Sequence, residues 1–266
     1  MLHLNDIALP AAAVTLLNTY QGEVDAMPTF PERVAEAKRL FSLRNKRNNP
    51  AFREVRKNLA EMSGGTERCN YCEDSKGDEV EHIYPKNFYP EKCFQWTNYC
   101  YACGPCNGPK DNQFAVVETG TGNEVLIDKL PAGANIPSGY VLLINPRTED
   151  PMEFLFLDIV NTFNFTPFKS GAKEKRRAEY TIDVLGLNSR SYLVKARKYA
   201  YLSYRARLRE YVHKKDAGVS QVELDALIEA QKSDHHRTVW CEMKRQRSLI
   251  AEIDRLFNEA PEALTW

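Results

Sequence analysis

Two Cys-x-x-Cys pairs constrain the fold of this chain more than any other feature: Cys69 with Cys72, and Cys103 with Cys106. Two thiolates at this spacing can both point inward from one tight turn, and two such turns make the tetrahedral four-sulfur site that zinc prefers. A closed shell of four thiolates has no open position for water, so this zinc would be structural. The spacing therefore predicts a zinc site that joins two distant parts of the chain.

The other cysteines leave one alternative open. Cys100 stands three residues before Cys103, so by spacing alone it could replace one of the four ligands. Cys93, Cys100 and Cys241 otherwise fit the pattern of small apolar residues. The chain has 7 cysteines, an odd number, and four of them form the two Cys-x-x-Cys pairs. In a reducing compartment this spacing favours a metal site over disulfides.

No apolar run has the length of a membrane span or the flanks of a signal peptide, so we expect a cytoplasmic protein without a membrane partner.

The pattern of apolar residues predicts an α+β fold that is mostly helical. The chain has 266 residues, of which 43% are hydrophobic and 27% charged, so it is long and apolar enough to form a globular core. Expected helices cover 10–22, 31–46, 50–62, 172–185, 189–213, 219–232 and 234–257; expected strands cover 114–119, 124–130, 140–146, 153–160 and 163–168. Asn49 is placed to cap the third helix and Pro50 to begin it. We therefore expect an N-terminal helical arm (1–65), a central metal module (66–118), a β-rich connector (119–168) and a helical C-terminal region (169–266).

A Glu-His step lies between the two cysteine pairs, in the sequence EHIYPK that begins at Glu81. A structural zinc site does not require these two residues, and a histidine beside a glutamate most often forms an ion pair at the surface. Hydrolysis of a phosphodiester, however, needs a group that can take a proton from water, and a neutral imidazole such as His82 does so at physiological pH. It also needs neutralisation of charge on the phosphate, which a hard divalent cation supplies through oxygen ligands.

The whole stretch resembles an HNH endonuclease motif of the ββα-metal type with a four-cysteine zinc site. Its ordered residues are Glu81, His82, Pro85, Asn98, Asn107 and Lys110. Because Asn107 and Lys110 follow the second cysteine pair in the family's order, the resemblance favours Cys103 and Cys106 over Cys100 as zinc ligands. It also implies that the central module is a ββα nuclease unit flanked by helices.

The resemblance implies a role for each of these residues. His82 would be the general base, and Glu81 and Asn107 would hold a single catalytic Mg²⁺ or Mn²⁺, distinct from the zinc. Asn98 would orient the loop between the strands rather than contact the metal. Lys110 is a candidate for contact with a phosphate or for capping the fold, with a solvated side chain as a further alternative. The chain departs from the family's usual pattern at Tyr99, where leucine is common, and at Glu81, where aspartate is more usual.

A narrower resemblance extends to the PtuB-type HNH proteins of bacterial anti-phage systems, the nuclease components of Septu and of some retrons. It rests on CNYCE, EHIYPK, W-x-N and C-x-x-CN-x-x-K, and more weakly on LLINPRTEDP and YTIDVLGLNSRSYLVKAR. It implies a partner, a PtuA-like ATPase with an ABC/SMC-type nucleotide-binding fold. The chain has no G-x-x-x-x-G-K-[ST] motif of its own. That absence agrees with a separate ATPase and equally with a solitary nuclease.

The C-terminal region begins with a strongly basic stretch: residues 169–215 contain 14 Lys and Arg against 4 Asp and Glu. Its tyrosines are Tyr192, Tyr199, Tyr201, Tyr204 and Tyr211. Cations at this density can neutralise phosphates and tyrosines can stack on bases, but tyrosines at helical spacing are usually core and cations usually solvated. Contact with DNA or RNA, contact with a protein partner and plain surface all remain open.

Three functions therefore stand at this point. The first is a metal-dependent HNH endonuclease that cuts DNA or RNA, acting as the effector of an anti-phage complex with an ATPase. The second is a stand-alone, restriction-type HNH nuclease. The third is a zinc-stabilised nucleic-acid-binding or scaffold protein without catalysis, which would bind without cutting.

Overall fold

The computed structural model describes residues 1–131 and 134–266, and it confirms a mixed helix and sheet composition in which 53% of the chain is helical. In chain order the helices are α1 (Ala11–Asp25), α2 (Phe30–Arg44), α3 (Pro50–Met62), α4 (Gly104–Lys110), α5 (Ala172–Val184), α6 (Ser191–Asp216), α7 (Gln221–Lys232), α8 (Arg237–Arg245) and α9 (Ala251–Glu259). The strands are β1 (Glu79–His82), β2 (Tyr99–Ala102), β3 (Ala115–Glu118), β4 (Glu124–Leu126), β5 (Gly139–Val141), β6 (Leu155–Leu157) and β7 (Phe165–Pro167).

The helices α2 and α3 begin at caps that the sequence encodes locally. Thr29 accepts a hydrogen bond from the backbone of Glu32, whose side chain bonds back to Thr29, so α2 starts with a complete capping box. Asn49 accepts from the backbone N–H of Phe52, and Pro50 occupies the first position of α3. The start of α3 is therefore as the sequence predicts.

The first helix is longer than the sequence predicts. The expected helix ends at Gly22, whereas α1 continues through that glycine and ends at Asp25. Val24, in the added turn, is fully buried. Burial of this apolar side chain offsets the low helix propensity of the glycine before it.

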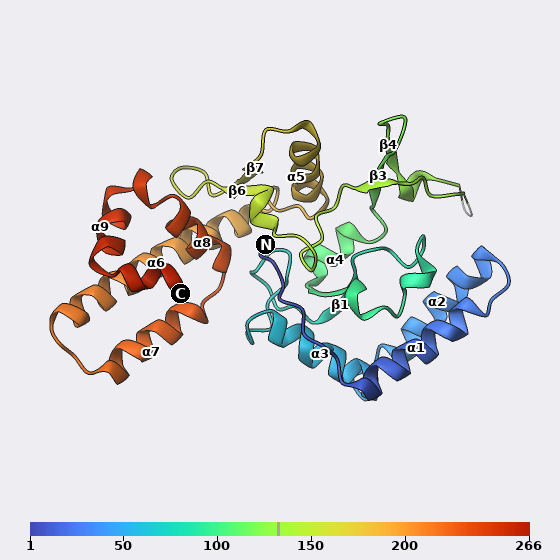
Figure 1. The fold of residues 1–266 in the computed structure, drawn as a ribbon, viewed down its shortest axis with the longest axis horizontal. Coiled ribbons are helices and arrows are strands. Elements are labelled where there is room, and N and C mark those ends of the chain that lie inside the picture. Colours follow the sequence, from blue (N-terminus) through green and yellow to red (C-terminus); the bar gives the residue numbers. More distant parts are fainter. Residues whose placement is uncertain (132–133) are drawn as a thin grey trace.

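The centre of the molecule is the antiparallel pair of β1 and β2, followed directly by α4. Glu79 lies opposite Ala102 and His82 opposite Tyr99 in this pair. Every residue of β2 is buried, because α3 packs against that strand while α4 packs against β1. Figure 1 shows α1, α2 and α3 together on one side of β1 and α4.

An aromatic cluster joins the N-terminal helices to this central pair. The rings of Phe41 (α2) and Phe52 (α3) lie 5.6 Å apart, and Phe52 lies 6.1 Å from Tyr99 on β2. Full burial of such a ring contributes about 1.5–3 kcal/mol relative to exposure. The N-terminal helices thus form the packed support for the end of β1, where the Glu-His step lies.

The region between α4 and α5 contains two further small sheets, with strand order β4-β3-β5 in one and β6-β7 in the other, all antiparallel. Each strand is shorter than the sequence predicts. In the expected strand 124–130, only Glu124–Leu126 is extended, because the chain turns into a short 3₁₀ helix at Ile127–Lys129. Apolar periodicity locates these strands but does not give their ends.

The C-terminal helices α6 to α9 form a group at the opposite end of the molecule from α1 and α2 (Figure 1). The prediction of one helix over 234–257 is wrong: α8 ends at Arg245 and α9 begins at Ala251. Gln246 leaves helical geometry, and its side chain donates to the carbonyl of Leu157 (2.7 Å). This bond to a strand 89 residues away is a tertiary contact that no local pattern signals.

None of the helices among the described residues is both long and apolar enough to cross a membrane.

Candidate active site and zinc centre

The four predicted zinc ligands come together in the structure. The Sγ atoms of Cys69, Cys72, Cys103 and Cys106 all lie within 4.8 Å of one another, and all four side chains are buried. The Cys72 and Cys103 sulfurs are 3.7 Å apart, close to the ~3.8 Å edge of a tetrahedron built on Zn–S bonds of about 2.3 Å. The donor set and its dimensions therefore fit a closed zinc site.

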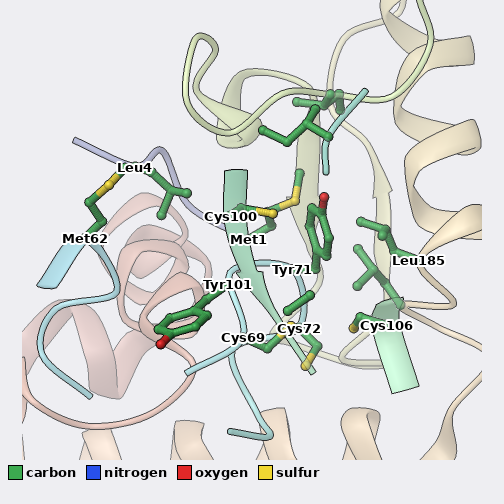
Figure 2. Packing of buried hydrophobic residues seen from close by; sticks show 14 of the residues in the cluster. Met1, Leu4, Met62, Cys69, Tyr71, Cys72, Cys100, Tyr101, Cys106 and Leu185 are labelled. Carbon is green, nitrogen blue, oxygen red and sulfur yellow. The ribbon is translucent and has the colours of Figure 1, made fainter. Parts of the chain in front are cut away.

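Cys100 does not belong to this cluster. It lies opposite Glu81 in the β1–β2 pair, and Figure 2 shows it apart from Cys69, Cys72 and Cys106. Burial raises the pKa of Cys100 to about 12, so this thiol stays protonated. The alternative in which Cys100 replaces one ligand is therefore excluded by position.

An arginine from the C-terminal half contacts the zinc cluster. Arg190 donates from Nη2 to the Sγ of Cys106 (3.2 Å) and to the carbonyl of Leu185 (2.7 Å). A hydrogen bond from a cation to a ligating thiolate offsets the negative charge of a four-thiolate site. The sequence gives no local signal for this contact, because Arg190 is 84 residues from Cys106.

His82 is held in one orientation at the end of β1. Its Nε2 lies 2.9 Å from the carbonyl oxygen of Cys93, which also accepts a bond from the hydroxyl of Tyr99 (2.6 Å). A carbonyl only accepts, so Nε2 carries the proton and Nδ1 keeps its lone pair. Burial, together with the positive charge of Lys86, lowers the pKa of His82 to about 3. The ring is therefore neutral at physiological pH with a lone pair on Nδ1, and the same burial makes it a weaker base than a solvated imidazole.

Asn98 closes the loop that joins β1 to β2. Its Oδ1 accepts from the backbone N–H of Tyr84 (2.7 Å), and its Nδ2 donates to the carbonyls of Tyr84 (3.1 Å) and Lys92 (2.9 Å). All three bonds go to backbone atoms of the loop. The side chain is thus placed to hold the loop's shape around His82.

A pocket of about 400 Å³ opens beside His82. Glu79, Glu81 and Asn107 line it, and Asn107 donates from Nδ2 to a carboxylate oxygen of Glu79 (2.6 Å). Glu79 and Glu81 are two residues apart on β1, so their side chains lie on the same face of the strand. Glu79 is absent from the residues predicted for the site, although its spacing of two residues from Glu81 was a signal that could have found it.

Lys110 is buried, so the expectation of a solvated side chain is wrong, and its position agrees with a side chain that caps the fold. Its side chain is fully buried, and Nζ donates to Glu81 (2.5 Å) and to the backbone carbonyl of His82 (2.8 Å). Burial raises the pKa of Glu81, and the neighbouring Lys110 ammonium opposes that rise. In this arrangement Lys110 supports the end of β1 from inside the protein.

Replacement of Lys110 by methionine tests this internal support. Removal of one partner leaves a buried carboxylate unpaired, so we expect Lys110→Met to lower the free energy of unfolding by about 3–5 kcal/mol. Denaturant unfolding measures the difference. Lys198→Met, at an exposed position of α6, is the matched control and should change stability by less than about 0.5 kcal/mol. Equal stability of the two variants would show that the ion pair does not hold β1.

No family model matches the sequence. The chain is 30% identical over 141 residues to the Septu protein PtuB of Bacillus thuringiensis, which is 51% of this chain and 42% of that protein. It is also 33% identical over 140 residues to a protein of Vibrio cholerae serotype O1 biovar El Tor that is named as the retron Vc95 putative HNH endonuclease. This aligned region covers 50% of this chain and 57% of that protein. The resemblance to PtuB-type HNH proteins is confirmed.

The matched region spans about half the length of each relative, at 42% and 57%. Besides Glu79, the pocket holds residues that no PtuB-type motif marks in the sequence. They are Asn45, which follows α2, Arg56 on α3 and Asp78, which precedes β1. Lys86 also lines the pocket, and it is the last residue of the EHIYPK motif.

The basic C-terminal region offers less free charge than its sequence indicates. Of its tyrosines, Tyr201, Tyr204 and Tyr211 are buried, so these three belong to the core. Arg197 is also buried and donates to the carbonyls of Phe163 and Leu187. Several other cations of α6 form ion pairs within the protein, among them Arg205, Arg207, Arg209, Lys214 and Lys215.

Proposed function

We propose that this protein is a metal-dependent HNH endonuclease that hydrolyses phosphodiester bonds of DNA or RNA. One observation carries the proposal: a neutral histidine with a fixed tautomer shares a pocket with the carboxylates of Glu79 and Glu81 and the amide of Asn107. The order β1, β2, α4 around a four-cysteine cluster supports a ββα nuclease module, as does the name of the retron relative.

His82 is the general base in this proposal. Its bond to the Cys93 carbonyl keeps the proton on Nε2, so Nδ1 takes the proton from the attacking water. The ring packs against Phe41, with ring centres 4.3 Å apart, which limits its rotation. Asn98 acts indirectly, because it holds the loop that carries the Cys93 carbonyl.

The oxygen donors that line the pocket fit a hard divalent cation. Glu81 and Asn107 are the predicted ligands, and Glu79 joins them because its carboxylate contacts Asn107. Such a cation, Mg²⁺ or Mn²⁺, would neutralise charge on the scissile phosphate and on the departing oxygen. The four-thiolate zinc site is separate and structural.

Two cations of the pocket replace Lys110 as phosphate contacts. Lys86 and Arg56 both line the pocket, and the Lys86 ammonium lies 5.4 Å from the centre of the Phe41 ring that packs on His82. Both side chains are partly exposed, whereas Lys110 is fully buried. A phosphate that enters the pocket would therefore meet Lys86 and Arg56.

The relatives suggest a cellular role. One is named as a Septu protein and the other as a retron protein, so we infer that this nuclease is a cytoplasmic effector of anti-phage defence. A PtuA-like ATPase of the ABC/SMC type is the expected partner. Purification from native lysate with a stoichiometric ATPase would support this role, and recovery of an active nuclease alone would favour the stand-alone alternative.

Cleavage assays with and without metal test the proposed activity. Purified protein would be incubated with plasmid, single-stranded DNA and total RNA in Mg²⁺ or Mn²⁺, and again with excess EDTA. We expect cutting only when the divalent cation is present. Zinc content, measured before and after, shows whether the structural site is intact. Binding without cutting by the zinc-loaded protein, alone and with its ATPase, would instead support the non-catalytic alternative.

A further inference from the structure

A second cleft, of about 290 Å³, lies on the surface beside the catalytic pocket. We call it the α3 groove. Most of its charged side chains are basic, and they come from α3, the loop before it and the loop before β1: Arg47, Arg53, Arg56, Lys57 and Lys76. Glu67 and Asp78 are its acidic residues. The groove therefore carries a clear excess of positive charge in a chain whose net charge is +0.

The α3 groove is continuous with the catalytic pocket, because Arg56 and Asp78 line both. Gly77 lies in the lining of the groove, where a Cβ would lie 3.0 Å from the carbonyl oxygen of Arg68 and 3.0 Å from the Cβ of Tyr101. The backbone here packs too closely to accept a side chain without movement. A chain of phosphates in the groove would thus reach the pocket past Arg56.

The cations of the groove differ in how far they are neutralised within the protein, and Lys76 is paired with Glu67 at 3.0 Å. Arg47 and Lys57 are exposed and, among the residues the structure describes, have no ion-pair partner. Arg53 lies 3.8 Å from Glu54 and keeps 68% of its side chain exposed. A cation already paired within the protein must give up that pair to bind a phosphate, so free cations are the better phosphate ligands.

We infer that the sugar-phosphate backbone of the nucleic acid lies along the α3 groove and enters the catalytic pocket past Arg56. This inference rests on the proposed nuclease function and adds the surface that holds the substrate. The contacts are to phosphates, so the groove positions the strand without reading its sequence. The substrate surface is on the N-terminal helices, not on the basic C-terminal helix that the composition indicates.

Charge reversal tests this inference. The variant Arg47→Glu, Arg53→Glu, Lys57→Glu changes three exposed positions of the groove. The matched control, Lys175→Glu, Lys195→Glu, Lys198→Glu, makes the same change of charge on α5 and α6. Binding of a fluorescein-labelled oligonucleotide, as single-stranded DNA, duplex DNA and RNA, is followed by anisotropy over a range of salt. Divalent cations are omitted, so binding is measured without cleavage.

We expect the groove variant to weaken binding about tenfold or more and to lower the salt slope by about 2 to 3, since each phosphate contact contributes about 0.7–0.9. The control should bind as the wild type does. A larger loss in the control, equal losses in both, or no binding by the wild type to any of the three probes would overturn the inference. A wild type that binds through the groove but never cuts with metal, either alone or with its ATPase, would refute the nuclease and leave the groove standing.

Discussion

Replacement of His82 by alanine is expected to lower the rate of phosphodiester cleavage by about 10²–10⁴-fold, the range for loss of a general base. The physical reason is the fixed tautomer: Nε2 is engaged by the Cys93 carbonyl, so Nδ1 is the ring atom left to accept a proton. Rates on the substrate identified by the cleavage assay, in Mg²⁺ or Mn²⁺, measure the change.

Two controls separate this loss from a folding defect. His82 is buried against Phe41, so His82→Gln is included as a variant that fills more of the site but cannot act as an imidazole base. His213→Ala changes an exposed histidine of α6 and should keep full activity. All variants should keep their zinc. Wild-type cleavage by zinc-loaded His82→Ala would rule out the proposed mechanism.

Replacement of Cys72 by alanine is expected to unfold the central module. Its sulfur lies in the cluster of four, 3.7 Å from that of Cys103. Structural zinc sites supply about 10–16 kcal/mol of apparent binding free energy, which is comparable to the about 5–15 kcal/mol by which most domains are stable. Loss of one ligand should therefore lower both zinc content and melting temperature, as measured by metal analysis and circular dichroism.

Cys100→Ala is the matched control, because Cys100 is equally buried but lies outside the cluster. This variant should keep its zinc and lose only the small packing contribution of one buried thiol. The opposite pattern, with zinc lost in Cys100→Ala and kept in Cys72→Ala, would show that the cluster is not the metal site.

The features that could be predicted from the sequence are those set by residues close together in the chain. Each Cys-x-x-Cys turn brings its two thiolates together within four residues. The four-cysteine site could therefore be predicted by assuming that the two turns share one metal ion. The start of α3 was equally predictable, since Asn49 and Pro50 act within one helical turn. The end of the last predicted helix was not, because Gln246 bonds to Leu157, far away in the sequence.

The sequence by itself determined the four clustered cysteines, the Glu-His step and the approximate order of helices and strands, because each depends on spacing or on a local cap. Only the tertiary structure decided that Lys110 is buried against Glu81, that Glu79 contacts Asn107, and that Arg47, Arg53 and Lys57 line a groove beside the pocket. The physical reason is that burial and ion pairing depend on which distant segments pack together. A lysine on a buried helix face and one on a solvated face look alike in a sequence until that packing is known.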